Sequence, residues 1–228
     1  MNTTNREVEK QGFGILPRLF SAREMQQLAD ELAGSTLRRT KAGIRHALGH
    51  EAVAAFTSDP RLLRIAREIL GSNAAPFRAT LFDKSPQANW LVVWHQDTAL
   101  PLQERRDMPG WGPWSIKEGI IYAHAPKAAL CQVLALRIHL EDSRADNGPL
   151  RILPGTHSNG VLTDDDIANL ATKITPVDCL VPQGGVLAMR PLVVHASSKS
   201  HVEAPRRVLH VEYAACKALA DGLELAIA

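Results

Sequence analysis

The residues whose types and spacing best suit chemistry lie in the stretch NWLVVWHQDTAL, from Asn89 to Leu100. Its apolar, aromatic and β-branched residues predict a β-strand that ends at His95 and Asp97. Because side chains alternate across a strand, these two residues point to the same side. An imidazole and a carboxylate on one strand face offer two ligands to a divalent metal ion.

A second histidine from a distant strand would complete a two-histidine, one-carboxylate site. Such a site leaves adjacent positions on Fe(II) open for oxygen and a co-substrate. His195 fits this role because it ends the β-like run PLVVH. However, His139 and His210 also fall on predicted strands, and His157 and His201 lie in loop-like segments. The residues alone therefore leave the third ligand open.

Length, charge and cysteine content narrow the class of protein. The chain of 228 residues is most simply a single domain, residues 1–228, with a net charge of +2. It has no dense block of lysine and arginine, so we expect no nucleic-acid partner. No apolar run resembles a signal peptide or a membrane span, so we expect no membrane association. Three widely separated cysteines fit reduced thiols and predict a cytoplasmic protein. No residue pattern determines the oligomeric state.

The order of predicted elements indicates the fold class. Helices are predicted in SAREMQQLADELAG, DPRLLRIAREILG and TDDDIANLATKI, with Ser21, Asp59 and Thr163 as N-caps. Residues 1–75 form a mostly helical buttress in this interpretation, and residues 76–216 form the β core. The β-like runs of that core are RATLFD, WLVVWHQD, QVLALRIHLED, VLAMRPLVVH and RRVLHVEYAA.

Helices followed by many strands predict a mainly β protein, a curved sandwich or barrel with flanking helices on one sheet. Alternation within the runs supports a polar interior. In LALRIHL, leucine and isoleucine alternate with Arg137 and His139. In the last run, Arg206 shares a face with His210, whereas Arg207 does not.

The segment at about 98–130 interrupts the strand rhythm with PLQERRDMPGWGPWSIKEG. A connection of this length is typical of a lid or binding loop. Trp111 and Trp114 in it are candidates for lining a substrate pocket, although tryptophans in long loops also pack on the domain.

Four motifs, in order, resemble the phytanoyl-CoA dioxygenase family of Fe(II)- and 2-oxoglutarate-dependent oxygenases. They are GFGILPRLFSAREMQQLADEL, the W-H-x-D of NWLVVWHQD, LEDSRADNGPLRILPGTH, and VVHASS followed by APRRVLHVEY. The resemblance covers most of the chain. It implies a double-stranded β-helix, a jelly-roll or cupin-like core with helices packed on the major sheet.

Carried over position by position, the resemblance implies that His95, Asp97 and His195 hold the iron. It implies that an arginine eleven positions after the distal histidine, Arg206, clamps the far carboxylate of 2-oxoglutarate. Strand alternation independently favours Arg206 over its neighbour. Ser197 matches a position that hydrogen-bonds the same carboxylate.

Arg137 and His139 project inward from a strand that borders the active site in the family. They are candidates for contact with 2-oxoglutarate or substrate, and buried structural hydrogen bonding is an equal alternative. Asp97 is a carboxylate where related halogenases have a small residue, which favours hydroxylation.

The implied function is hydroxylation of an unactivated C–H bond of a small-molecule metabolite, with Fe(II), 2-oxoglutarate and O2, releasing succinate and CO2. One alternative is a non-catalytic jelly-roll protein that binds a metal or small molecule. Another is a cupin-type enzyme that uses a different metal. Neither alternative needs Arg206 together with all three metal ligands. The absence of a dense basic cluster favours a free metabolite over a CoA thioester as substrate.

Overall fold

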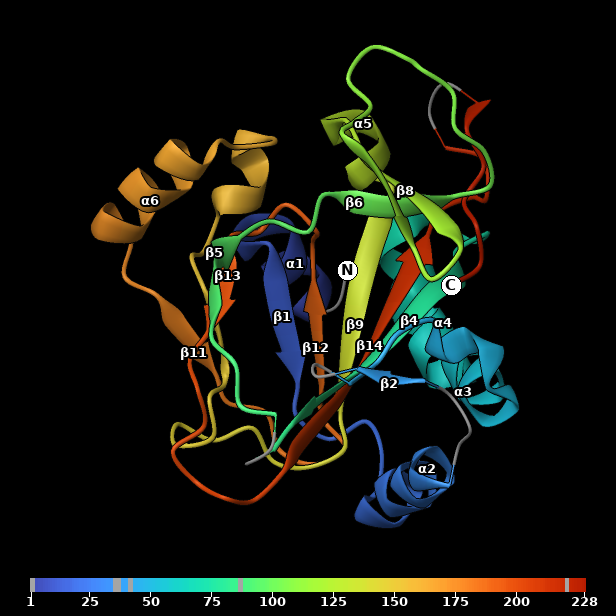
Figure 1. The fold of residues 1–228 in the computed structure, drawn as a ribbon. Helices are drawn as coiled ribbons and strands as arrows, with labels where there is room; N and C mark the ends of the chain where they lie inside the picture. The colour runs from blue at the N-terminus through green and yellow to red at the C-terminus, as the bar shows by residue number, and fades with distance from the viewer. Residues whose placement is uncertain (1–2, 35–37, 41–42, 86–87, 220–221) are drawn as a thin grey trace.

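The computed structural model of the protein describes residues 3–34, 38–40, 43–85, 88–219 and 222–228. Within these ranges the strands pair antiparallel and form the sheets drawn in Figure 1. The major sheet has the spatial order β1 (Phe13–Leu16), β12 (Val186–Met189), β9 (Val133–His139), β14 (Arg206–Ala214), β4 (Ala75–Lys84), β3 (Gly43–Ile44) and β2 (Arg39–Thr40).

Two smaller sheets complete the β structure of the described residues. The minor sheet has the order β11 (Val177–Cys179), β10 (Leu150–Ile152), β13 (His195–Ser197) and β5 (Val92–His95). The hairpin sheet has the order β6 (Ala99–Leu102), β8 (Ile120–His124) and β7 (Trp114–Lys117). In Figure 1 the minor sheet lies on the left, and β9, β14 and β4 run through the middle of the molecule.

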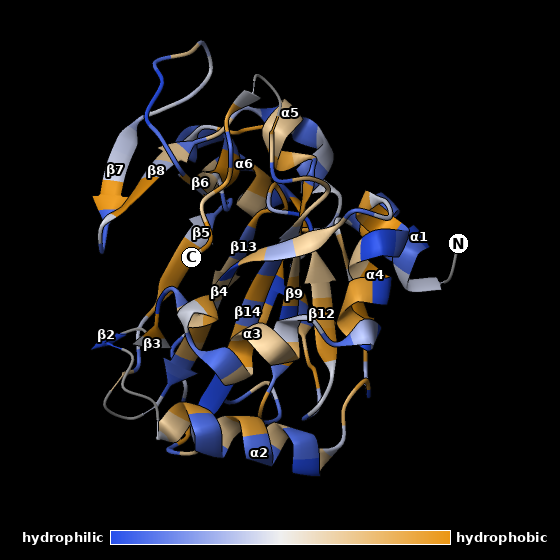
Figure 2. Cartoon of the chain, turned by 90° about the vertical axis from the view of Figure 1, so that its right-hand side faces the viewer, coloured by the Kyte–Doolittle hydropathy of each residue, from blue (hydrophilic) through white to orange (hydrophobic). Residues whose placement is uncertain are grey.

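The helices of the described residues are α1 (Thr3–Gln11), α2 (Ala22–Ala33), α3 (Glu51–Thr57), α4 (Pro60–Leu70), α5 (Lys127–Leu130) and α6 (Asp164–Lys173), with 3-10 turns η1 (Ala47–Gly49) and η2 (Thr156–Asn159). Helices α3 and α4 stand in front of the major sheet in Figure 2. Among the described residues, no helix combines the length and apolar character needed to cross a bilayer.

The predicted helix caps are confirmed. The Ser21 hydroxyl accepts a hydrogen bond from the Glu24 backbone N–H, and the Glu24 carboxylate accepts one from the Ser21 backbone N–H. Thr163 and Asp166 form the same reciprocal pair at the start of α6. Each pair satisfies backbone donors that the first helical turn leaves without partners. These local signals explain why both helices begin where the sequence predicts.

The alternation of side chains separates the two faces of the major sheet as predicted. Leu134, Leu136 and Ile138 of β9 are fully buried and pack with α2 and α4 in the largest apolar cluster. On the opposite face, Arg137 and His139 of β9 lie with Arg206, His210 and Glu212 of β14, also buried. The interior between the sheets is therefore strongly polar, and the apolar core lies on the helix side.

Three predicted boundaries differ in the structure. The run 186–195 is not one strand, because Arg190 to Val194 turns the chain from β12 in the major sheet to β13 in the minor sheet. Residues 98–130 are not an irregular loop, since they contain the hairpin sheet and α5. The helical segment 1–75 also supplies β1, β2 and β3 to the major sheet.

The apolar layer between helices and sheet yields a stability prediction. Leu136→Ala removes a fully buried side chain from this layer and should lower the free energy of unfolding by about 2–5 kcal/mol. Urea titration followed by circular dichroism measures the change. The matched substitution Leu180→Ala, at a residue 50% exposed, should cost less than about 1 kcal/mol. Equal losses at the two positions would contradict the core placement of Leu136.

Candidate metal centre

The structure brings His95, Asp97 and His195 together. His95 ends β5 and His195 begins β13, and the two residues are direct partners in the antiparallel register. Their imidazole centroids lie 4.2 Å apart. Asp97 follows β5, and its backbone N–H donates to the Pro191 carbonyl at 2.9 Å. Three residues from two distant parts of the chain therefore lie together at the edge of the interior.

Both imidazoles are oriented in the same way. His95 Nδ1 lies 2.9 Å from the carbonyl oxygen of Val93, and His195 Nδ1 lies 3.0 Å from that of Val193. In each case the carbonyl belongs to the residue two positions earlier, so the proton sits on Nδ1. Such a bond fixes the tautomer and leaves Nε2 as the free electron-pair donor.

The free ring nitrogens converge on the Asp97 carboxylate. His95 Nε2 lies 3.7 Å from Asp97 Oδ1, and His195 Nε2 lies 3.6 Å from Asp97 Oδ2. All the ligand atoms of the group fall within 4.8 Å of one another. Two ligands about 2.1 Å from a metal ion and at right angles stand about 3 Å apart, so small side-chain adjustments would suffice. The donor set and spacing fit a divalent ion such as Fe(II).

The local electrostatics also suit metal binding. Burial lowers the pKa of His195 to about 4, although Asp97 opposes the shift. Burial acts to raise the pKa of Asp97, but His195 and His95 outweigh it and hold that pKa well below the ordinary value. A neutral imidazole and an ionised carboxylate are the forms that coordinate metals.

A cluster of buried cationic side chains lies beside the three candidate metal ligands. Arg206 of β14 and Lys84 of β4 are directly opposite in the antiparallel register, and they are 5% and 1% exposed. Among the described residues, neither forms an ion pair within 4 Å of a carboxylate. Like charges placed opposite each other destabilise a sheet. Burial, followed by repulsion from neighbouring cations, lowers the pKa of Lys84 to about 8 and that of Arg206 to about 10.

The polar atoms of this pair are only partly satisfied. Lys84 Nζ donates to Ser197 Oγ at 2.7 Å and to the Ser198 carbonyl. Arg206 Nε donates to the Asn147 carbonyl at 3.1 Å, whereas its buried Nη1 has no hydrogen-bond partner among the described residues. A buried guanidinium nitrogen without an acceptor is costly, and a bound anion would supply the acceptor.

Arg137 lies between the cations and the metal-ligand candidates. Its Nη1 is 3.0 Å from His210 Nδ1, its guanidinium lies 5.3 Å from the Phe82 ring centre, and its buried Nε has no partner in the described part of the chain. His139 is buried with both ring nitrogens unpartnered. Burial, then Arg137 and Arg206, hold its pKa well below the ordinary value, so His139 is neutral.

One cavity of about 110 Å³ joins these groups. The three candidate metal ligands line one part of it, and Ser197, Arg137 and Arg206 line another. The remaining lining residues are Phe82, Trp90, Val92 and Leu150. The Lys84 ammonium lies 5.4 Å from the centre of the Trp90 ring. The cavity thus has one part lined by the candidate metal ligands and another part lined by cationic side chains.

Trp111 and Trp114, predicted as pocket candidates, lie elsewhere. Trp111 is buried in an apolar cluster with Leu100 and Leu102 of the hairpin sheet, and Trp114 packs against that cluster. Neither lines the cavity described above. Of the competing histidines, His157 Nε2 contacts the Glu9 carbonyl and His201 is exposed, and neither lines the cavity.

Lys84 is the site residue that sequence reasoning missed. The predicted run RATLFD ended at Asp83, whereas β4 continues to Lys84. In this strand Ala79 and Leu81 face the apolar cluster on the helix side. Alternation from these two residues would have placed Lys84 on the interior face.

Comparison with known proteins identifies the family to which the chain is similar. A family model described as phytanoyl-CoA dioxygenase (PhyH) matches residues 8–208. An ectoine dioxygenase from Stutzerimonas stutzeri (strain A1501) is 23% identical over 244 residues, covering 90% of this chain and 74% of that protein. An L-proline trans-4-hydroxylase from Streptomyces griseoviridis is 24% identical over 189 residues, covering 72% of this chain and 63% of that protein.

The fold has close counterparts among solved structures. The crystal structure of EctD from S. alaskensis with 2-oxoglutarate and 5-hydroxyectoine superposes with a TM-score of 0.71 at 19% identity, over 94% of this chain and 76% of that one. HygX from Streptomyces hygroscopicus with nickel and 2-oxoglutarate bound gives 0.68 at 18% identity, over 94% and 87%. The predicted jelly-roll core is confirmed by these likenesses. Because the family model spans most of its residues, the chain belongs to the phytanoyl-CoA dioxygenase family of Fe(II)- and 2-oxoglutarate-dependent dioxygenases.

Proposed function

We propose that this protein hydroxylates a C–H bond of a small-molecule metabolite. The overall reaction consumes the metabolite, 2-oxoglutarate and O2, and yields the hydroxylated metabolite, succinate and CO2. His95, Asp97 and His195 are the proposed iron ligands. Arg206, Ser197 and Lys84 are the proposed anchor for the far carboxylate of 2-oxoglutarate.

The main support is the pairing of two unlike groups in one cavity. A keto acid with a second carboxylate has a chelating end and an anionic end. The cavity offers a two-histidine, one-carboxylate group and, next to it, buried cations without carboxylate partners among the described residues. A non-catalytic metal binder would have no use for this uncompensated charge.

The cationic residues have distinct parts in this proposal. The planar guanidinium of Arg206 can donate two parallel hydrogen bonds to a carboxylate, and its free Nη1 is available for one of them. Lys84 holds the Ser197 hydroxyl in place through a 2.7 Å hydrogen bond and adds a second positive charge. Arg137 extends the positive region towards the proposed metal ligands. Together these residues orient the co-substrate and exclude water from its anionic end.

Iron, when bound, supplies oxygen activation and the oxidation of a C–H bond. The chain's own contribution is orientation. The Val93 and Val193 carbonyls hold both imidazoles with Nε2 directed at Asp97. The Asp97 carboxylate occupies a position that could otherwise accept a halide, which supports hydroxylation. Two relatives named for small molecules, ectoine and L-proline, support a small metabolite as the substrate.

Loss of a proposed metal ligand tests the function. His95→Ala and Asp97→Ala should each lower Fe(II)-dependent formation of succinate from 2-oxoglutarate more than about 100-fold, because each removes a donor to the metal. Iron binding measured by calorimetry under anaerobic conditions should weaken in parallel. His201→Ala is the matched control, since this exposed histidine lies outside the cavity. Unchanged succinate formation in both ligand variants would refute the metal assignment.

The anchor for 2-oxoglutarate gives a second prediction. Arg206→Ala should raise the dissociation constant for 2-oxoglutarate about 10–100-fold, because it removes a charged hydrogen-bond donor. Arg207→Ala is the control, since that guanidinium pairs with Glu141 instead. Anaerobic calorimetry with Fe(II)-loaded protein measures both. If Arg137→Ala weakened 2-oxoglutarate binding and Arg206→Ala did not, the assignment of the anchor would be wrong.

The lowered pKa of Lys84 predicts a pH effect on the same binding step. A lysine with a pKa near 8 loses its charge as the pH rises from 7 to 9, whereas an ordinary lysine keeps it. The dissociation constant for 2-oxoglutarate should therefore increase above pH 8. In Lys84→Met, binding should already be weaker at pH 7 and should change less with pH. A wild-type constant that stays flat from pH 7 to 9 would contradict the role of Lys84.

A further inference from the structure

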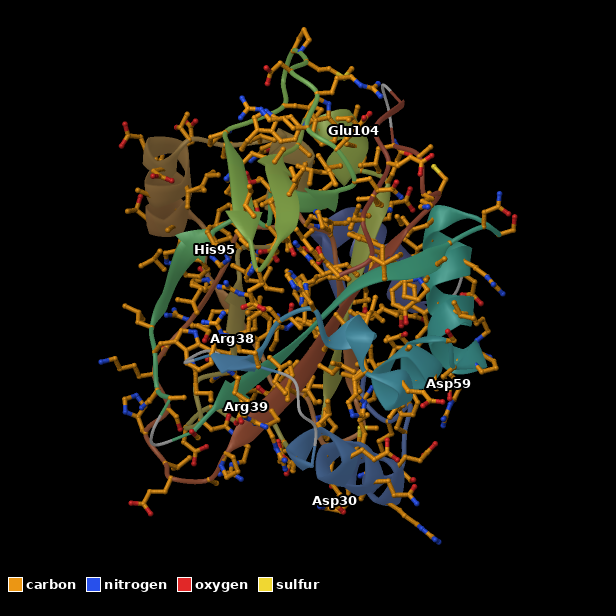
Figure 3. The ribbon with its side chains drawn as sticks, turned by 45° about the vertical axis from the view of Figure 1, so that its right-hand side comes forward. Asp30, Arg38, Arg39, Asp59, His95 and Glu104 are labelled. Atoms are coloured by element: carbon orange, nitrogen blue, oxygen red, sulfur yellow. The ribbon has the colours of Figure 1, made fainter. Side chains whose placement is uncertain are left out.

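Gln96 lies in the chain between two of the proposed metal ligands, His95 and Asp97. Its side chain is only 8% exposed and does not line the cavity that the ligands share. Trp94, two residues earlier, packs with Ile167 of α6 on the outer side of β5. Figure 3 shows His95 at the end of β5, close to this helix. Gln96 therefore carries a buried amide directed away from the metal side of the strand.

The amide of Gln96 forms three hydrogen bonds to backbone groups. Nε2 donates to the Leu192 carbonyl at 2.7 Å and to the Gly160 carbonyl at 2.9 Å. Oε1 accepts from the Leu162 backbone N–H at 2.8 Å. Both N–H donors are used, and this determines the orientation of the amide. With oxygen and nitrogen exchanged, the oxygen would face two carbonyls and the nitrogen would face an N–H.

The Leu192 carbonyl belongs to the turn that leads directly to His195. This turn, residues 190–194, joins β12 to β13 and is largely buried, since Leu192 is 3% exposed and Val193 is fully buried. The Val193 carbonyl orients the His195 imidazole through the 3.0 Å contact with Nδ1. A displacement of the turn would therefore move or rotate one of the proposed ligands.

Asp97 depends on the same turn for its position. β5 ends at His95, so strand pairing does not fix the Asp97 backbone. Its N–H donates to the Pro191 carbonyl at 2.9 Å, and the Gln96 side chain binds the next carbonyl, that of Leu192. Two adjacent residues of one ligand-bearing segment thus bind two adjacent carbonyls of the other.

The remaining two hydrogen bonds of Gln96 reach the connection between η2 and α6. Gly160 and Leu162 lie in this connection, and Leu162 directly precedes Thr163, the N-cap of α6. Leu162 also packs against the apolar cluster that includes Val194. The connection is thus fixed by the capping box on one side and by apolar packing on the other. The amide of Gln96 joins three chain segments that are distant in sequence.

Packing alone does not require an amide at this position. A buried amide costs more to remove from water than an apolar side chain of similar length, unless all its polar groups are paired. When they are paired, the amide allows one arrangement of the segments that it joins. Such precision is most useful beside a metal centre, where distances from the ligands to the ion vary by only about 0.2 Å.

We propose that Gln96 is a positioning residue of the metal centre. Its amide holds the segment that carries His95 and Asp97 against the turn that carries His195, and it braces both against the start of α6. Gln96 acts through the backbone of these segments and does not touch the metal. This inference rests on the metal-binding role proposed above for the three ligands.

The proposal differs from a purely structural role in what the loss of Gln96 should change. A structural glutamine contributes to the free energy of unfolding, but the folded protein without it would bind iron as before. A positioning residue also sets the affinity for the metal. Outer groups that orient metal ligands typically contribute about 10–100-fold to metal affinity.

The test is an anaerobic titration of the metal-free full chain with Fe(II) in the presence of 2-oxoglutarate, followed by the charge-transfer band. Gln96→Met keeps an unbranched side chain of similar length but cannot form the three hydrogen bonds. At a temperature where circular dichroism shows folded protein, its dissociation constant for Fe(II) should be about 10–100-fold above that of the wild type. A folded Gln96→Met variant that binds Fe(II) with the wild-type constant would overturn the proposal.

Gln183→Met is the matched control. The Gln183 Nε2 also donates to a backbone carbonyl, that of Leu140, at 2.8 Å, but this side chain does not line the cavity. Its loss should change the Fe(II) dissociation constant less than about twofold. If Gln183→Met weakened iron binding as much as Gln96→Met, the effect would be general destabilisation and the positioning role would be refuted.

Gln96→Asn provides a second variant that retains a polar amide. The asparagine side chain is one methylene shorter, so it cannot reach all three backbone groups at once. We expect its Fe(II) dissociation constant to rise about tenfold. If Gln96→Met does not fold, this variant decides the question, and a wild-type constant for folded Gln96→Asn would overturn the proposal.

The wild-type titration separates this inference from the proposed function. If the wild-type protein bound no Fe(II) and gave no charge-transfer band, the metal assignment itself would fail. If the wild type bound Fe(II) with the band and both Gln96 variants did the same with equal affinity, only the positioning role of Gln96 would be wrong.

Discussion

The antiparallel register between β5 and β13 is the constraint on which the rest of the site depends. It sets His95 directly opposite His195, and the strand period of two then places Asp97 on the same side. A slip of one residue would turn either imidazole to the other face of the sheet. The register is secured at both ends. Asn89 exchanges side-chain hydrogen bonds with the Ser200 backbone, and the Asp97 backbone donates to Pro191. Within that frame the valine carbonyls set the tautomer of each ring.

The interior face of the major sheet carries more positive charge than its own carboxylates can balance. On one side of Asp97, Lys84 and Arg206 oppose each other across β4 and β14 without a carboxylate partner in the described residues. Arg78, which lies opposite Glu212 in the register of β4 and β14, is balanced by its ion pair with that residue. Burying unpaired charge is expensive, so this pattern is better explained by anionic ligands than by stability. The proposed metal centre therefore lies beside a region suited to the far carboxylate of the co-substrate.

Sequence reasoning succeeded where the information is local. Capping residues such as Ser21 and Thr163 define helix ends within one turn, and alternation in β9 and β14 separates apolar from polar faces. The expectation that His95 and Asp97, at the end of β5, point to the same side also follows from a period of two. The pairing of His95 with His195 is different, because the residues alone left several histidines open until the family resemblance was applied.

The sequence could not reveal features that depend on how distant segments meet. Arg78 and Lys117 meet at the Tyr122 ring only because the hairpin sheet lies beside β4. The sequence did not indicate strands within residues 98–130, because proline, glycine and charged residues interrupt the apolar pattern there. These short strands are stabilised by pairing with one another. For the same reason, the chain turn at Pro191 between two sheets resembled one continuous strand.

The most direct test of the account is an anaerobic titration of metal-free protein with Fe(II) in the presence of 2-oxoglutarate. If His95, Asp97 and His195 hold one ion and leave positions open for a chelating keto acid, a weak visible metal-to-ligand charge-transfer band should appear. It should saturate at one iron per chain and be absent from Asp97→Ala. A titration that binds iron without producing the band, or a band that persists in Asp97→Ala, would contradict the proposed centre.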